Sequence, residues 1–129
     1  MYYKIVHPKN GSFWSTNYAP INENVEFGTC LEYVPYIWTF PKIKRSKLFI
    51  FSNLEHAIQF YKRGYRDKTI FECKAINPKK TGPINIELTH EILKAIKNKK
   101  KYTHLVDASD TPLGTLFCDA VQITKRVKI

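Results

Sequence analysis

Residues 48–64 read LFIFSNLEHAIQFYKRG and predict a buried strand that leads directly into a helix. The strand is the apolar run 48–51. Ser52 and Glu55 have the spacing of a capping box, in which each side chain binds the backbone N–H of the other residue at a helix start. Gly64 supplies a left-handed stop at the far end. We therefore predict a helix over about residues 53–63. Its apolar residues are spaced three or four positions apart, which places them on one face of the helix. That face consists of Leu54, Ala57, Ile58 and Tyr61.

Strand patterns lie on both sides of this unit. Residues 2–7 and 12–16 are apolar and rich in β-forming residues, and the Asn10-Gly11 pair between them favours a tight hairpin turn. Residues 69–76 alternate between two faces, as a strand does. Residues 115–129 show the same alternation over a greater length, and we predict one long closing strand there.

The remaining segments complete the predicted fold. Residues 17–24 read as a polar loop, and the aromatic segment 25–39 reads as one or two bent strands. A second, shorter helix is predicted from the spacing of Leu88, Ile92, Leu93 and Ile96. Strands without regular strand–helix–strand alternation favour the α+β class. We expect residues 1–129 to form a single domain, a mainly antiparallel twisted sheet of about five to seven strands with two helices packed on it.

Apolar runs and cysteine content predict the location of the protein in the cell and the state of its thiols. The chain of 129 residues contains no apolar run approaching the roughly 18 residues needed to cross a bilayer, and its start lacks the apolar core of a signal peptide. We therefore expect an intracellular protein that does not bind a membrane. Cys30, Cys73 and Cys118 are odd in number and far apart, so we expect free thiols rather than disulfides or a zinc site.

The charge balance indicates an anionic partner. The net charge of +10, from 21 basic and 11 acidic residues, attracts a protein to phosphate-rich or acidic surfaces. However, 17 of the cations are Lys and only four are Arg, whereas phosphate and base recognition favours the Arg fork. A chain rich in Lys, Ile and Asn is also what an A+T-rich genome encodes. An anion-binding face and a codon-bias origin of the charge therefore both stay open.

Aromatic residues are concentrated in the first forty positions. Because neighbouring residues of a strand face opposite sides, one set of rings in residues 33–40 is expected to reach a surface or a cleft, the alternative being that both sets are buried. Exposed rings beside cations form a stacking platform for nucleotides or an anchor for a partner protein. The predicted ligand-binding residues are Tyr33, Tyr36, Trp38, Lys42, Lys44, Arg45, Lys47, Arg126 and Lys128.

Evidence for catalysis is weaker. No His lies four residues from another His in an H-E-x-x-H pattern, and the five glycines are isolated, so we predict neither a metal site nor a cofactor. His7, Ser15-Thr16, Tyr33 and Glu72 occur in an order that resembles ADP-ribosyltransferase-type enzymes. That resemblance implies that Glu72 orients an acceptor or stabilises an oxocarbenium-like ribose. Glu72 also alternates with Lys74 on one strand face, where a cross-strand ion pair is the competing interpretation. We expect a binding protein rather than an enzyme.

Three segments carry a second resemblance, namely YYKIV (2–6), LFIFSNLEHAIQF (48–60) and GTLFCDAV (114–121). Together they resemble uncharacterised small α+β proteins of phages and other DNA viruses. The resemblance implies a shared scaffold and transfers no functional residue. We expect a small basic viral-type protein that captures an anionic partner, either a nucleotide-type ligand or an acidic host-protein surface, and so blocks a host process. Nucleic-acid binding and an ADP-ribosyltransferase-like enzyme, or its inactive relative, are the alternatives.

Overall fold

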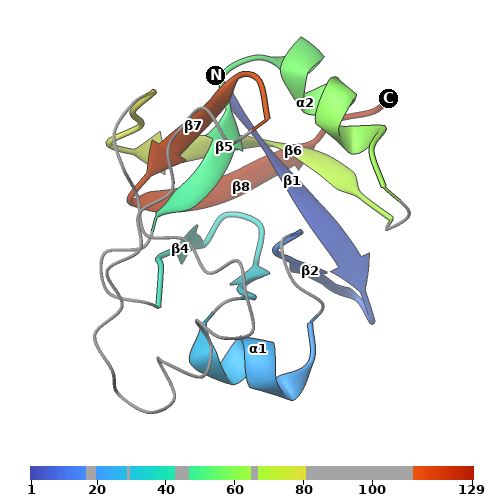
Figure 1. Cartoon of the computed structure of the whole chain (residues 1–129), viewed down its shortest axis with the longest axis vertical. Helices are drawn as coiled ribbons and strands as arrows, with labels where there is room; N and C mark the ends of the chain where they lie inside the picture. The colour runs from blue at the N-terminus through green and yellow to red at the C-terminus, as the bar shows by residue number, and fades with distance from the viewer. Residues whose placement is uncertain (17–19, 29, 43–46, 65–66, 81–111) are drawn as a thin grey trace.

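The computed structural model describes residues 1–16, 20–28, 30–42, 47–64, 67–80 and 112–129 (Figure 1). Within these residues the chain forms an antiparallel sheet with two helices. The strands are β1 (Tyr2–Lys9), β2 (Ser12–Trp14), β3 (Glu32–Tyr33), β4 (Trp38–Thr39), β5 (Leu48–Phe51), β6 (Thr69–Ile76), β7 (Thr115–Cys118) and β8 (Ala120–Arg126). The helices are α1 (Asn22–Phe27) and α2 (Leu54–Tyr61).

The strand pairing confirms the α+β class and the mainly antiparallel sheet. The path of paired strands is β3-β2-β1-β6-β8-β4, while β5 pairs with β1 and with β7. The described residues contain eight strands, more than the expected five to seven. The difference arises because the predicted strand over residues 115–129 bends at Asp119 and continues beside a different partner. The aromatic segment adds two strands of only two residues each.

The N-terminal hairpin forms where the sequence predicts it. β1 and β2 pair antiparallel with Lys9 opposite Ser12. Asn10 and Gly11 take φ angles of 52° and 80°. A two-residue turn with both φ values positive matches the right-handed twist of the strands on either side, and Asn and Gly adopt it at the least cost. This turn therefore fixes the register of β1 with β2.

The β5–α2 unit is also confirmed, with a different cap. Asn53, not Ser52, is the N-cap: its side-chain oxygen accepts a hydrogen bond of 2.9 Å from the backbone N–H of His56. The backbone N–H of Ser52 instead donates to the carbonyl of Gly114, 3.1 Å away, at the start of β7. Gly114 has a φ of 82°, and a Cβ on it would lie 2.2 Å from the His56 ring. The helix start is thus fixed by its contact with β7.

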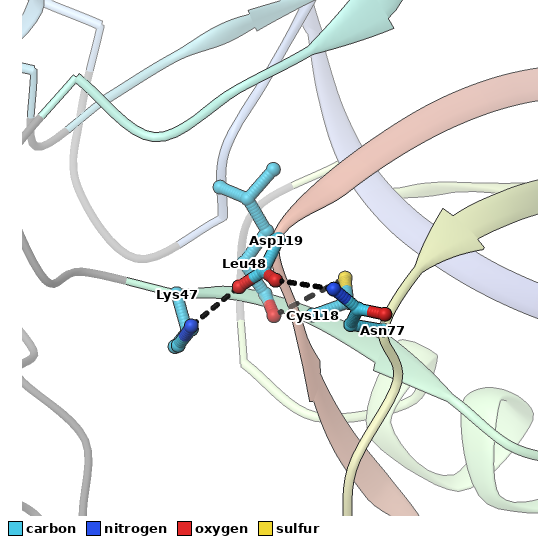
Figure 2. A network of polar contacts seen from close by, with 5 residues as sticks. All are labelled: Lys47, Leu48, Asn77, Cys118 and Asp119. Carbon is cyan, nitrogen blue, oxygen red and sulfur yellow. Dashed lines mark hydrogen bonds and ion pairs between the residues drawn. The ribbon is translucent and has the colours of Figure 1, made fainter.

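The bend between β7 and β8 is held by polar contacts of Asp119 (Figure 2). Its carboxylate accepts hydrogen bonds from the ammonium group of Lys47 and, at 2.9 Å, from the side-chain amide of Asn77. The backbone N–H of Asp119 donates to the carbonyl of Ile76 at 2.8 Å. The pKa of Asp119 lies below its usual value, chiefly because of these two side-chain hydrogen bonds. The network joins the start of β5 and the end of β6 to the bend.

Two apolar clusters lie on opposite sides of β1 and β6. The cluster that we call the main core takes Val6 from β1 and Phe71 from β6. The cluster that we call the α2 core takes Ile5 and Ile70 from the same strands and packs against α2. Both strands alternate between the two cores, as the period of two requires. The main core also contains Leu31, Tyr33, Leu48, Ile50, Cys73, Leu116, Cys118, Val121 and Ile123.

The helices agree only in part with the prediction. α1 occupies residues that read as the end of a polar loop and the start of a strand, and Figure 1 shows it at the end of the molecule opposite α2. It has only six residues and no side-chain N-cap bond, which explains why the sequence shows no helix signal. The predicted helix around residues 88–96 lies outside the described residues. Neither α1 nor α2 has the length and apolar character that crossing a membrane would require.

Candidate functional site

The predicted aromatic residues have three different environments. Tyr33, in β3, is buried in the main core with 1% of its surface exposed, so its ring does not reach solvent. Trp38, in β4, is half-buried. Tyr36, in the turn between these strands, is 62% exposed. Tyr36 is therefore the predicted ring that is most accessible to a ligand or a partner, whereas the buried Tyr33 ring is not accessible.

The backbone of Tyr36 is held in an unusual conformation. Its φ is 65°, in the left-handed region where a residue with a large side chain is rare. Its N–H donates to the Ile123 carbonyl at 2.8 Å, and its carbonyl accepts from the Gln122 side-chain amide at 3.0 Å. Both partners belong to β8, which pairs with β4 through Trp38 and Gln122. Strained backbone of this kind persists only where surrounding contacts determine it, and it is concentrated at functional sites.

Exposed apolar side chains accompany Tyr36 on the same short segment. Ile37 is 58% exposed and Phe40 is 57% exposed, and Val34 is also exposed. The Ile37 N–H donates to the Val34 carbonyl at 3.1 Å, which closes the turn. Contiguous exposed apolar groups on a folded protein mark contact sites more often than single ones do. We call this set the Tyr36 surface, and it consists of Val34, Tyr36, Ile37 and Phe40.

Cations lie on both sides of this segment. Lys42 is exposed two residues after Phe40. On β8, Lys125 and Arg126 are exposed. At a strand rise of about 3.3 Å per residue, Lys125 lies about 7 Å along β8 from the residue that binds the Tyr36 N–H. Lys42 and Lys125 are therefore exposed cations near the Tyr36 surface along the chain or along the paired strand, and Lys125 was not among the predicted residues.

The other predicted cations are distributed differently. Lys47 forms an ion pair with Asp119, so its charge is already compensated (Figure 2). Lys128 is exposed beyond the end of β8. Lys44 and Arg45 lie outside the described residues. Lys42, Arg126 and Lys128 are therefore the three predicted cations that the structure places outside ion pairs within its described part.

Tyr33 does meet a cation, in the interior of the protein. Lys4 is buried with 7% exposure, and its Nζ lies 4.9 Å from the centroid of the Tyr33 ring. The same Nζ donates to the Phe49 carbonyl at 2.7 Å. Cation–π contact and a hydrogen bond together compensate part of the cost of burying the charge. This pair was not predicted, although the alternation of β1 places Lys4 on the same face as Val6.

The residues of the enzyme hypothesis do not come together. Glu72 is paired with Tyr3 on β1, four residues before His7, a separation of about 13 Å along the strand. His7 and Glu72 share the side of the α2 core by alternation, whereas Tyr33 belongs to the main core on the other side. His7 Nδ1 lies 2.8 Å from the Asp67 carbonyl oxygen, which can only accept, so this nitrogen carries the proton. This hydrogen bond joins the His7 side chain of β1 to Asp67, two residues before β6.

The three cysteines are buried. None of Cys30, Cys73 and Cys118 takes part in a disulfide. Burial raises the pKa of Cys73 to about 12 and that of Cys118 to about 11. Because the thiolate is the reactive form, neither of these two groups is activated as a nucleophile at neutral pH.

No family model, curated protein or solved structure matches this chain. The resemblances to viral proteins and to ADP-ribosyltransferases therefore stay predictions. The function has to be argued from the residues themselves.

Proposed function

We propose that this protein binds an acidic surface of a partner protein through the Tyr36 surface and the cations beside it. The observation that carries the proposal is Tyr36 itself, a large aromatic residue held at a φ of 65° with 62% of its surface in solvent. A glycine or asparagine would satisfy this backbone position at less cost. The strained position and the exposed ring are explained together if the ring is needed for contact.

The shape of the Tyr36 surface favours a protein over a small ligand. Small molecules bind in concave sites, whereas Val34, Tyr36 and Ile37 lie on a tight turn at the sheet edge next to β8. Side chains that project from such a turn can enter a hollow on another protein. Tyr is also enriched among the residues that contribute most to binding at protein interfaces. The two hydrogen bonds to β8 hold the turn in one conformation before any partner binds, which reduces the conformational entropy lost on binding.

The charge favours an acidic partner. Lys42 follows the segment along the chain and Lys125 lies on β8, two residues beyond the partner of the Tyr36 N–H, and the whole chain carries a net charge of +10. Like charges oppose the approach of a second copy of the same face, while an acidic surface is attracted from a distance. Glu32 is an exposed carboxylate close to β4, because the Thr39 hydroxyl donates to the Glu32 carbonyl at 3.4 Å. Binding at this place would block whatever contact the partner makes there with other proteins.

The proposal is tested by comparing what three forms of the protein recover from cells. The forms are the wild type, Tyr36→Ser and, as a matched control with an exposed apolar residue elsewhere, Leu113→Ser. We expect a protein with an acidic surface that the wild type and the control recover and that Tyr36→Ser loses. Binding of the purified pair is then measured over a salt series, where Lys125→Gln should weaken it at low salt and Glu32→Gln should strengthen it.

Two results would contradict the proposal. One is that no recovered protein depends on Tyr36. The other is that the wild type binds single-stranded oligonucleotides with a steep salt dependence, which Tyr36→Ser reduces, because stacking of bases on the exposed ring would then be the function.

A further inference from the structure

A second surface feature lies at the end of the sheet where β1 and β8 finish and β6 begins. It is a cavity of about 370 Å³, which falls within the range of roughly 300–1,000 Å³ that small-molecule sites occupy. None of its lining residues belongs to the Tyr36 surface. Pro8, Tyr61, Thr69 and Arg126 lie at the ends of four elements, and Asp67 and Lys68 directly precede β6.

Two cations line this cavity. The Nζ of Lys68 donates to the Phe60 carbonyl at 3.3 Å and lies 5.2 Å from the centroid of the Phe60 ring. These contacts hold the ammonium group in place without neutralising it, and burial lowers the pKa of Lys68. Arg126 is exposed at the end of β8. Within the described residues neither cation is part of an ion pair, so the cavity has positive charge that is available to a ligand.

The other lining groups restrict the chemistry of that ligand. The lining also includes Tyr61 and Thr69, whose side chains carry hydroxyl groups, and Asp67, whose side chain is a carboxylate. The Asp67 carbonyl is occupied by His7, which fixes the loop that carries this carboxylate. A carboxylate repels a bare anion, but it accepts hydrogen bonds from hydroxyl groups. The set therefore suits a molecule with an anionic group at one end and hydroxyl donors near it.

We propose that this cavity binds a phosphate monoester that carries hydroxyl groups, such as a sugar phosphate or a ribonucleotide. The Arg126 fork and the Lys68 ammonium receive the phosphate, because a guanidinium matches two phosphate oxygens and a lysine adds a point charge. The Asp67 carboxylate accepts from the hydroxyl groups. Among the residues that line the cavity, only Arg126 was predicted from the sequence as a ligand-binding residue. The proposal is independent of partner binding at the Tyr36 surface.

The test is a titration of the whole protein, followed by amide chemical shifts, with ribose 5-phosphate, inorganic phosphate and ribose as probes. For a ligand of this size we expect a Kd of about 1 mM or tighter for ribose 5-phosphate. Arg126→Gln should weaken it about 10–100-fold, the usual effect of losing a charge-assisted hydrogen bond. Lys128→Gln, an exposed cation two residues further on that does not line the cavity, should change it by less than about threefold.

Asp67→Asn separates the two halves of the site. We expect it to weaken ribose 5-phosphate and to strengthen inorganic phosphate, because it removes both an acceptor and a negative charge. Tyr36→Ser should leave both affinities unchanged, which keeps this proposal distinct from the protein-binding function. The proposal is overturned if ribose 5-phosphate gives no saturable shifts, if it binds no more tightly than inorganic phosphate, or if Arg126→Gln and Lys128→Gln bind it equally well. Far-UV circular dichroism of each variant confirms that it is folded.

Discussion

Replacing Tyr36 by glycine and by alanine tests whether the turn is held at a positive φ. Both variants remove the ring, so the difference in their stability reports on the backbone alone. A residue with a Cβ at a φ of 65° costs roughly 1–2 kcal/mol. Glycine avoids this cost but loses about 0.5–1 kcal/mol through the greater freedom of the unfolded chain. We therefore expect Tyr36→Gly to be more stable than Tyr36→Ala by about 0.5–1 kcal/mol.

The assay is thermal and urea unfolding of both variants, followed by far-UV circular dichroism. For a chain of this length, the expected difference corresponds to about 2–5 °C in Tm. The control is the same pair of substitutions at Val34, in the same turn, where φ is not positive. At Val34 glycine should be the less stable residue by about 0.5–1 kcal/mol. If alanine is as stable as glycine at position 36, the turn does not hold this conformation and the argument for a strained binding residue fails.

Further predictions concern the glycine contact at α2 and the buried thiols. Gly114→Ala should destabilise the fold more than Gly11→Ala does. The two positions have nearly the same φ, but an added Cβ meets the His56 ring at position 114 and nothing within 4 Å at position 11. Equal losses of stability in urea unfolding would show that the close approach to His56 is absent. The raised pKa values of Cys73 and Cys118 predict alkaline instability. Thiols of the unfolded chain ionise near their ordinary value of 9.0 while the folded thiols stay protonated, so the free energy of unfolding should fall as pH rises from 9 through about 11 and 12. This fall should be shallower in a variant with alanine at both positions, and an identical slope would contradict the burial argument.

Much of the fold could be predicted because local signals agree with the tertiary contacts. The Asn10-Gly11 turn, the strand 69–76 and the helix after residue 53 are each specified within a few residues. The bend at Asp119 was missed because it depends on Lys47 and Asn77, which are 72 and 42 residues away in the chain. The cap at Asn53 was missed for a similar reason, since the Ser52 N–H has a competing acceptor in the β7 turn.

The candidate sites were less predictable than the fold. Strand alternation predicts that one alternating set of these side chains is exposed, but residues 34–37 form a turn, and the neighbours Tyr36 and Ile37 are both exposed. Tyr33 is buried because β3 pairs with β2 and packs on the main core, whereas Tyr36 is exposed because its backbone leaves the strand conformation. Lys68 carries no sequence signal, because its position depends on contacts with Phe60 at the end of α2.

The ion pair at the β7–β8 bend decides whether Lys47 contributes to partner binding. The pKa of Asp119 is lowered first by the hydrogen bond from Lys47 and then by that from Asn77. The ionised carboxylate therefore stabilises the fold above its ordinary pKa of 3.8, and this stabilisation is lost as pH falls through the lowered folded value. For an exposed pair we expect Lys47→Met to lower the free energy of unfolding by less than about 1 kcal/mol at neutral pH, and not at all once Asp119 is protonated.

Because Asp119 compensates the charge of Lys47 in the free protein, Lys47→Met should weaken binding to an acidic partner less than Lys125→Gln does. Urea unfolding over a pH series and binding at low salt measure the two effects on the same variants. An equal loss of binding in both variants would mean that the partner breaks the ion pair and recruits Lys47. In that case the binding surface would extend along β8 from Lys125 to the bend at Asp119, and the polar network would be part of the site rather than only of the fold.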